Sequence, residues 1–228
     1  MRCEFIPIDY NYFDYEGKNY IKIVGRTSKN TQICLIDDYQ PNFWLILQKD
    51  AKQDQINQLI KKIKKIEIKN NIRKTTITDI QIHNKKFLEK NVKAIQIFAT
   101  NHKDLHEIAS EIGDNEIILH RREYDINIIS KYIMEKHLKP LLWYTIDAIP
   151  LTTEDFGGII NVIDLEASFK LNTFKESKEQ IEFKPKVLAY DIETKDIEIG
   201  KSEIFMISLY GENFEKVLTC QQTNNPQE

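Results

Sequence analysis

Near its end the chain carries the stretch Lys186-Val187-Leu188-Ala189-Tyr190-Asp191-Ile192-Glu193-Thr194, a short apolar run with two acids one residue apart. In a β-strand, side chains two residues apart point to the same face, so Asp191 and Glu193 are expected side by side. Two acids on one face of an otherwise buried strand are costly unless a cation neutralises them. Because Mg²⁺ prefers carboxylate oxygens, the pattern predicts a metal-binding strand. The alternative is a strand end whose acids simply reach water.

The composition is that of an ordinary globular protein. The 228 residues are 41% hydrophobic and 29% charged, and 32 Lys and Arg against 35 Asp and Glu give a net charge of −3. Any basic surface must therefore be local. The three cysteines are scattered, which argues against a disulfide framework or a thiolate zinc site and fits a reducing cytosol. No signal peptide and no apolar run of bilayer length are evident, so we expect a cytoplasmic protein with no membrane partner.

The first 40 residues predict a small β-meander. Asn19 to Arg26 alternates apolar and polar residues, and Asp14 to Lys18 supplies a hairpin turn before it. Thr31 to Asp37 continues the alternation.

Residues 41–121 predict a strand–helix–strand–strand–helix–strand unit. A buried strand at Phe43–Leu47 precedes an amphipathic helix that opens at Asp50 or Lys52 and runs to Ile66, with lysines on its other side. Strands are expected at 76–83, 92–99 and 116–120, with a helix capped by Asn101 and ended by Gly113 before the last of them. This order is the split βαβ arrangement of ferredoxin-like and RNA-recognition folds.

That unit raises a nucleic-acid hypothesis. An RNA-recognition module needs aromatic side chains on its central strands to stack bases. Phe98 is the only aromatic residue on the 92–99 strand and Phe87 lies before it, so the sequence does not favour direct RNA readout by these strands.

The remaining chain predicts one helix, further strands and a domain boundary. Asp125 is the expected cap of a helix over 126–136, and strands at 143–149 and 159–164 are expected to return to the opening meander. The polar segment Lys170 to Lys184 reads as a surface connection, which places the boundary between domains at 184/185. Three strands follow it, at 187–192, 204–210 and 216–219.

Other candidate sites are weaker. His102 and His106 share a helix face, but no third ligand is evident and an exposed face explains them. Gly157-Gly158 reads as a turn. Arg121-Arg122 suits either a phosphate or an ion-pair network at a helix entry.

Several ordered segments resemble one family. Phe183 to Thr194 looks like the first exonuclease motif of family B DNA polymerases, in which an apolar strand ends in Asp-Ile-Glu-Thr. Upstream, Arg122 to Ile126, Lys131 to Ile133 and Leu138 to Pro140 resemble the stretch that precedes that motif. Tyr39 to Phe43 resembles the segment that opens the family's RNA-recognition-like subdomain. The spacing agrees with archaeal members.

The resemblance implies an α+β protein in two parts. Residues 1–184 would form the polymerase N-terminal domain, a β-meander or barrel with the βαββαβ subdomain inserted at 41–121. Residues 185–228 would begin a ribonuclease H-like 3′-5′ exonuclease, in which Asp191 and Glu193 are catalytic ligands of Mg²⁺ or Mn²⁺. DNA is the implied partner, in the nucleoid, together with the rest of a polymerase.

In archaeal relatives the N-terminal domain also holds a pocket that captures uracil in the template. Tyr12 matches a pocket tyrosine and Pro41 a pocket proline. His102, Leu105 and Arg122 stand where a proline, a valine and an aromatic ring are typical, and this departure argues against uracil capture.

The other departure concerns the exonuclease. The family's later exonuclease aspartates have no match after Glu193, and two carboxylates make an incomplete two-metal site. We therefore expect a piece of a polymerase that is inactive alone. The alternatives are a non-catalytic nucleic-acid- or subunit-binding module and a free-standing small nuclease, which the missing aspartates disfavour.

Overall fold

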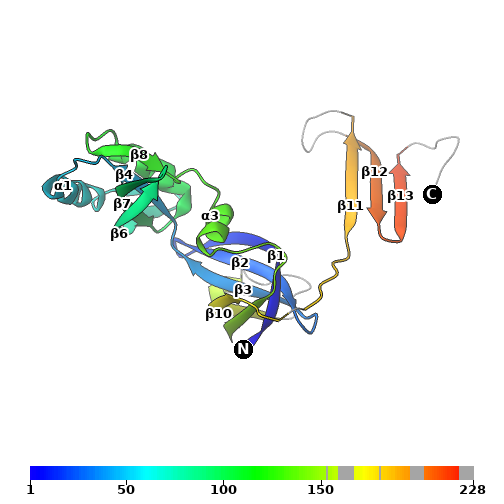
Figure 1. Ribbon diagram of the computed structural model, residues 1–228. Coiled ribbons are helices and arrows are strands. Elements are labelled where there is room, and N and C mark those ends of the chain that lie inside the picture. Colours follow the sequence, from blue (N-terminus) through cyan, green and yellow to red (C-terminus); the bar gives the residue numbers. More distant parts are fainter. Residues whose placement is uncertain (153, 159–166, 180, 196–202, 221–228) are drawn as a thin grey trace. The chain divides into compact units, whose positions relative to one another are not determined.

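The computed structural model describes residues 1–152, 154–158, 167–179, 181–195 and 203–220. The chain divides into two compact units, Met1–Gln180 and Ile181–Glu228. The fold is mixed α+β and dominated by sheets (Figure 1). Among the described residues, no helix is long and apolar enough to cross a bilayer.

The first unit contains a closed five-stranded barrel in the order β1-β2-β3-β10-β9. Its strands are β1 (Arg2–Tyr15), β2 (Lys18–Thr27), β3 (Gln32–Tyr39), β9 (Tyr144–Pro150) and β10 (Ala167–Glu176). Neighbours are antiparallel except for β3 and β10, which run parallel, and β9 closes the ring by pairing with β1. Closure matters because it leaves none of these strands as an unpaired edge.

Alternating side chains of the barrel strands fill its interior. Phe5, Ile21, Ile23 and Leu35 are fully buried there. At Gly25 the strands approach so closely that an added Cβ would lie 2.2 Å from the carbonyl oxygen of Ile6, which no side chain tolerates.

Helix α3 (Ile128–Glu135) packs on this barrel. Its Tyr132 is fully buried, and the phenol donates a hydrogen bond of 2.8 Å to Asp37 on β3. The helix begins after Asn127, whose side chain accepts from the backbone N–H groups of Ile129 and Ser130. The predicted cap at Asp125 is therefore wrong by two residues.

Between β3 and α3 the chain builds a second sheet, in the order β5-β6-β7-β4-β8. Its elements in chain order are β4 (Asn42–Leu47), α1 (Gln53–Ile63), β5 (Glu67–Lys69), β6 (Lys74–Phe87), β7 (Lys90–Ala99), the short helix η1 (His102–Asp104), α2 (Leu105–Ile112) and β8 (Ile118–Arg122). All pairings in this sheet are antiparallel. Both α1 and α2 contribute to the core on one of its faces.

The ends of these helices follow local sequence. Asn101 accepts a hydrogen bond of 3.0 Å from the backbone N–H of Lys103, and Gly113 ends α2 at a φ of 67°. Helix α1 stops at Ile63, earlier than expected, yet Ile66 beyond it is still buried. Leu88 and Glu89 both have positive φ, which makes the tight turn between β6 and β7.

The second unit is a three-stranded antiparallel sheet in the order β11-β12-β13. The strands are β11 (Leu188–Thr194), β12 (Ile204–Gly211) and β13 (Phe214–Thr219).

Two further sequence expectations need correction, and one lies outside the described residues. The segment Lys170 to Lys184 is not all connection, since its first seven residues belong to β10. Every residue of β11 is exposed, so the strand is not buried. The strand expected at 159–164 falls outside the described residues. A short helix at Asp155–Gly158 contains Gly157 and Gly158, both at positive φ, as a turn requires.

Candidate functional site

Asp191 and Glu193 lie on one face of β11. They pair across to Ser208 and Met206 of β12, and alternate residues of a strand share a face. Both carboxylates are exposed, and Asp191 also accepts a 3.1 Å hydrogen bond from the backbone N–H of Ile192. The predicted side-by-side arrangement is therefore present, on a strand edge open to approach.

The opposite face of the same sheet is apolar. It carries Leu188, Tyr190 and Ile192 of β11, with Ile207 and Leu209 opposite them on β12. Tyr190 is 70% exposed and Leu188 is 54% exposed. Apolar strand faces normally pack against another layer, so this sheet presents a surface suited to burial.

The donor set on the acidic face suits a hard divalent cation. Two carboxylates offer oxygen ligands, and no Lys or Arg among the described residues lies within ion-pair distance of either. Within the same residues there is no group of three or more His, Cys, Asp and Glu arranged to hold a metal. Asp191 and Glu193 thus fit part of a metal site.

Tyr12, one of the two residues predicted for a template-base pocket, lies half-buried on β1. The ring of His102 meets it edge to face, with centroids 4.6 Å apart, and the Lys103 ammonium lies 5.8 Å from its centroid. Lys103 also pairs with Asp14 at 2.6 Å. Burial lowers the pKa of His102 below its ordinary value, against the opposing charge of Asp14.

The other residues matched to the template pocket lie in different surroundings. Pro41 is buried in the link to β4, where its carbonyl accepts a hydrogen bond from the N–H of Ala99. Leu105, the first residue of α2, is buried in the core between the helices and the sheet. Arg122 lies over the ring of Phe87. The side chains at these positions point to different surroundings.

A buried ion pair supports the His102 segment from beneath. Asp104 is 1% exposed and accepts hydrogen bonds from Arg73 and Thr75. Burial by itself would raise the pKa of Asp104, but these hydrogen bonds and the guanidinium charge outweigh it and hold the pKa below its ordinary value. The loop that carries His102 is therefore tied to the start of β6.

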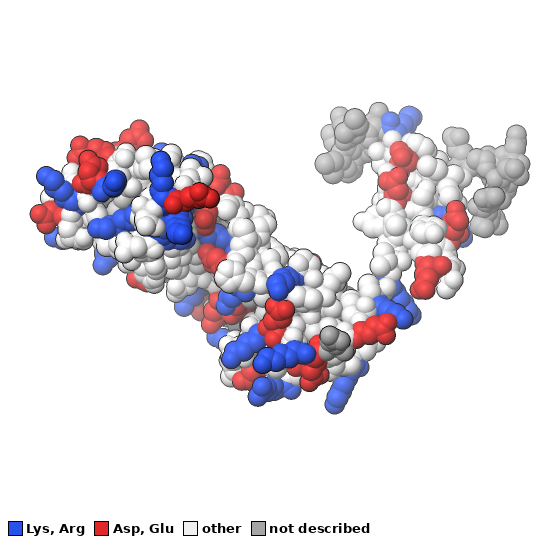
Figure 2. All heavy atoms as spheres, in the orientation of Figure 1, with Lys and Arg blue, Asp and Glu red and all other residues white. Residues whose placement is uncertain are grey.

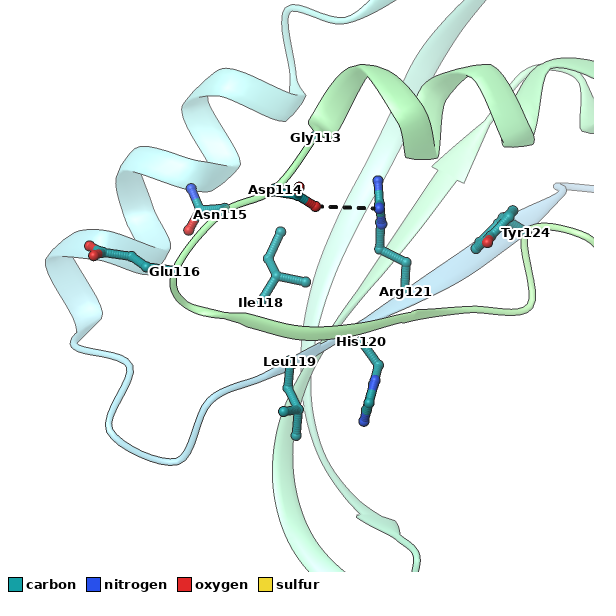
Figure 3. Close-up of a pocket in the computed structure, with 9 residues that line it drawn as sticks. All are labelled: Gly113, Asp114, Asn115, Glu116, Ile118, Leu119, His120, Arg121 and Tyr124. Carbon is teal, nitrogen blue, oxygen red and sulfur yellow. Dashed lines mark ion pairs between the residues drawn. The ribbon is translucent and has the colours of Figure 1, made fainter.

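A hollow of about 530 Å³ lies beyond the end of α2. Figure 3 shows Arg121 reaching toward Asp114 across it, an ion pair of 3.7 Å. Arg121 also donates to the carbonyl of Ala109. Since its guanidinium is already engaged, the ion-pair interpretation of Arg121 is favoured over phosphate binding.

Known proteins resemble this chain in sequence and in fold. The family described as DNA polymerase family B, exonuclease domain, matches residues 119–228, the segment that contains Asp191 and Glu193. DNA polymerase 1 of Pyrococcus abyssi and the DNA polymerase of Thermococcus kodakarensis are each 23% identical over 222 residues, 96% of this chain. The chain is similar to archaeal DNA polymerases over nearly its whole length, and residues 119–228 match the family B exonuclease domain.

The chain spans a small part of the proteins it matches. It covers 23% of the Pyrococcus abyssi enzyme and 11% of the Thermococcus kodakarensis protein. The structure of the family B DNA polymerase from Pyrobaculum calidifontis superposes on 97% of the chain with a TM-score of 0.71, at 15% identity and over 27% of that polymerase. The likeness establishes a shared fold.

One group of residues escaped sequence reasoning. Trp44 and Phe87 come from strands distant in sequence, yet they pack into the same cluster on the sheet face away from α1 and α2. The sequence gives no sign of this face, because Phe43 to Leu47 are all apolar. Without alternation, the residues of β4 that face away from the helices are not distinguished from the others.

Proposed function

We propose that the chain is the N-terminal part of a DNA-directed DNA polymerase, binding template DNA and supplying the first motif of a 3′-5′ proofreading exonuclease. The observation that carries this proposal is the pair Asp191 and Glu193, side by side on a strand within the segment that matches the exonuclease family. The relatives are named DNA polymerases.

Asp191 and Glu193 would be ligands for Mg²⁺ or Mn²⁺. Bound divalent metals in such a site lower the pKa of an attacking water and stabilise the leaving oxygen. The chain's own contribution is to hold two carboxylate oxygens at a fixed spacing on β11 and to leave that face accessible.

The remaining polymerase segments would complete the site, in the same polypeptide or in a partner chain. Two carboxylates are too few for a two-metal centre, and the apolar side of the β11–β13 sheet needs a covering layer. In isolation, residues 1–228 would neither extend a primer nor degrade DNA. The completing segments would supply further carboxylates and bury Tyr190 and Leu188.

The architecture supports a finer assignment. The order of β4, α1, β6, β7, α2 and β8, with β4 and β7 central, fits the ferredoxin-like RNA-recognition fold at 41–121. The antiparallel sheet β11–β13 would be the first three strands of a ribonuclease H-like domain that begins at 185. The compact units divide at 180/181, within the same linking segment.

A second candidate is a non-catalytic nucleic-acid- or subunit-binding module. It is favoured by the absence, among the described residues, of a third metal ligand near Asp191 and Glu193. The two functions differ in what the acidic pair does. A binding module would tolerate the double substitution Asp191→Asn/Glu193→Gln in every assay.

Reconstitution tests the proposal. The chain would be expressed with the segments of its source's family B polymerase that carry the polymerase motifs, and primer extension from a mismatched 3′ end would be measured. We expect the complex to remove the mismatch before extending the primer. A complex with Asp191→Asn/Glu193→Gln should extend matched primers and leave the mismatch in place. Equal mismatch removal by both complexes would contradict the exonuclease role.

A further inference from the structure

We propose that the face of the β4–β8 sheet turned away from α1 and α2 binds single-stranded DNA, with Phe87, Trp44 and His120 as base-stacking rings and Lys85 and Arg122 as phosphate contacts. This inference rests on the proposed function, because it assigns the template-binding role to a particular surface. No part of it uses Asp191 or Glu193.

The register of the sheet brings these residues to one face. His83 lies opposite Ala94 and Lys85 opposite Val92 across the β6–β7 pair. On the other side of β7, Trp44 and Ile46 of β4 lie opposite Gln96 and Ala94, and β8 places Arg122 beside Trp44 and His120 beside Ile46. Figure 3 shows His120 pointing away from α2, on the other side of β8 from Arg121.

Rings and cations alternate across this face. The ring of Phe87 lies 5.4 Å from that of His120 and 5.6 Å from the guanidinium of Arg122. The ammonium of Lys85 lies 3.4 Å from the centroid of the Trp44 ring, which is itself 5.3 Å from His83. Proteins bind single-stranded nucleic acids with aromatic side chains next to basic ones. The bases stack on the rings, and the phosphates contact the cations.

The cations of this face have no acidic partner. Among the described residues, no carboxylate lies within 4.0 Å of the charged groups of Lys85, Lys90 or Arg122, whereas Lys103, Lys131 and several other basic residues pair with acids. A cavity of about 630 Å³ continues the basic surface past Val92, and it is lined by Lys49, Lys90 and Lys93 with no carboxylate. Figure 2 shows Lys and Arg side chains on the visible surface of this part of the chain, with acids among them.

The other end of the same face is closed. There Asn42 donates a hydrogen bond of 2.9 Å to Glu135 of α3 and accepts one from Gln96. Asp79 places a carboxylate beside Phe98 at that end. The open and unpaired part of the face is therefore the part near the β6–β7 turn, and a strand is expected to run from Trp44 past Phe87 toward Lys90.

Trp44 is 8% exposed, and the Lys85 ammonium lies over its ring. A base that stacks on Trp44 must displace the lysine side chain, which frees the ammonium to reach the adjacent phosphate. A cation–π contact is a weak interaction, so a stacking base is able to compete with the lysine.

The test is fluorescence anisotropy of the full chain with a labelled oligo(dT), with a duplex and with an RNA of the same length as further arms. Phe87→Leu keeps an apolar side chain but removes the ring, and we expect it to weaken binding by about 5- to 100-fold, the worth of one stacked base. Lys85→Ala/Arg122→Ala should weaken binding and reduce the slope of log K against log salt by about 1.4, for two phosphate contacts. Lys61→Ala/Lys64→Ala, exposed lysines on and just after α1, are the matched control and should leave affinity and slope unchanged.

Five outcomes decide the matter. Loss of affinity in the sheet variants with none in the control supports the inference. Wild-type affinity in the sheet variants overturns the inference and leaves the proposed function standing. An equal loss of affinity in the control variant also overturns the inference alone. Tighter binding of duplex or RNA than of single-stranded DNA overturns the assignment to single-stranded DNA. A wild-type chain that binds no DNA overturns both this inference and the template-binding role.

Discussion

Arg73 and Asp104 form a two-pronged ion pair in which the guanidinium Nε lies 2.7 Å from one carboxylate oxygen. The pair joins the residue before β6 to the residue before α2. It thereby fixes the segment that holds His102 against Tyr12. Since Asp104 is buried, this relationship controls both the stability of the sheet unit and the shape of the surface around Tyr12.

Arg73→Ala should destabilise the protein substantially. It leaves the Asp104 carboxylate buried with Thr75 as its remaining side-chain donor, and breaking a buried pair in this way costs about 3 kcal/mol. Urea unfolding followed by circular dichroism measures the change. The double variant Arg73→Ala/Asp104→Ala removes the stranded charge and should recover part of the loss. A single variant as stable as the wild type would show that the pair has no structural role.

Acid should remove the contribution of Asp104. A carboxyl whose folded-state pKa is depressed stabilises the protein above its unfolded value near pH 4, and this contribution is lost as the pH falls through the folded pKa. The gap in unfolding free energy between wild type and Asp104→Asn should therefore be greatest at neutral pH and shrink below about pH 4. Unfolding curves of both proteins across this range give the gap. A gap that is independent of pH would refute the ion-pair account.

Gly25→Ala should disrupt the barrel. The new methyl group would meet the Ile6 carbonyl at 2.2 Å and the Phe5 ring at 2.4 Å, and a backbone oxygen within a closed barrel has little room to move. We expect a loss of about 3 kcal/mol or more, at the upper end for overpacking. Thermal unfolding tests this, with Lys22→Ala on the same strand as the control. Wild-type stability for Gly25→Ala would contradict the requirement for glycine between β1 and β2.

The chain should not distinguish uracil from thymine. The Tyr12 ring is already occupied by His102, and Leu105 and Arg122 face other surroundings. Affinities for single strands that contain deoxyuridine or thymidine should agree within about twofold, less than 0.5 kcal/mol. Competition binding with matched oligonucleotides supplies the comparison. A tenfold preference for uracil would contradict this prediction and support a uracil-binding pocket that includes Tyr12 and Pro41.

Much of the fold was accessible from local sequence patterns. Asn101 and Gly113 delimit the helical segment formed by η1 and α2, because a capping side chain and a residue at positive φ leave clear signatures. The strand β10 was missed for a physical reason. Its pairing with β9 shifts register between Leu171 and Thr173, so the apolar residues Phe169, Leu171 and Phe174 do not alternate regularly.

The candidate site was only partly accessible. Asp191 and Glu193 are neighbours on one strand, so spacing alone predicts that they share a face. The contacts of Trp44, Phe87 and His120 depend on the register of four paired strands, and a sequence does not state that register. The exposure of β11 was not predictable from its own residues either, because it depends on which other segments cover the sheet.

The exonuclease role of Asp191 and Glu193 has one direct measurement. A single strand labelled at its 5′ end is incubated with Mg²⁺ and either the chain alone or the chain completed by the remaining polymerase segments of its source. The account predicts no shortening by the chain alone, stepwise shortening from the 3′ end by the complex, and none by the complex with Asp191→Asn/Glu193→Gln. Degradation by the pure chain, or equal degradation by the substituted complex, would contradict it.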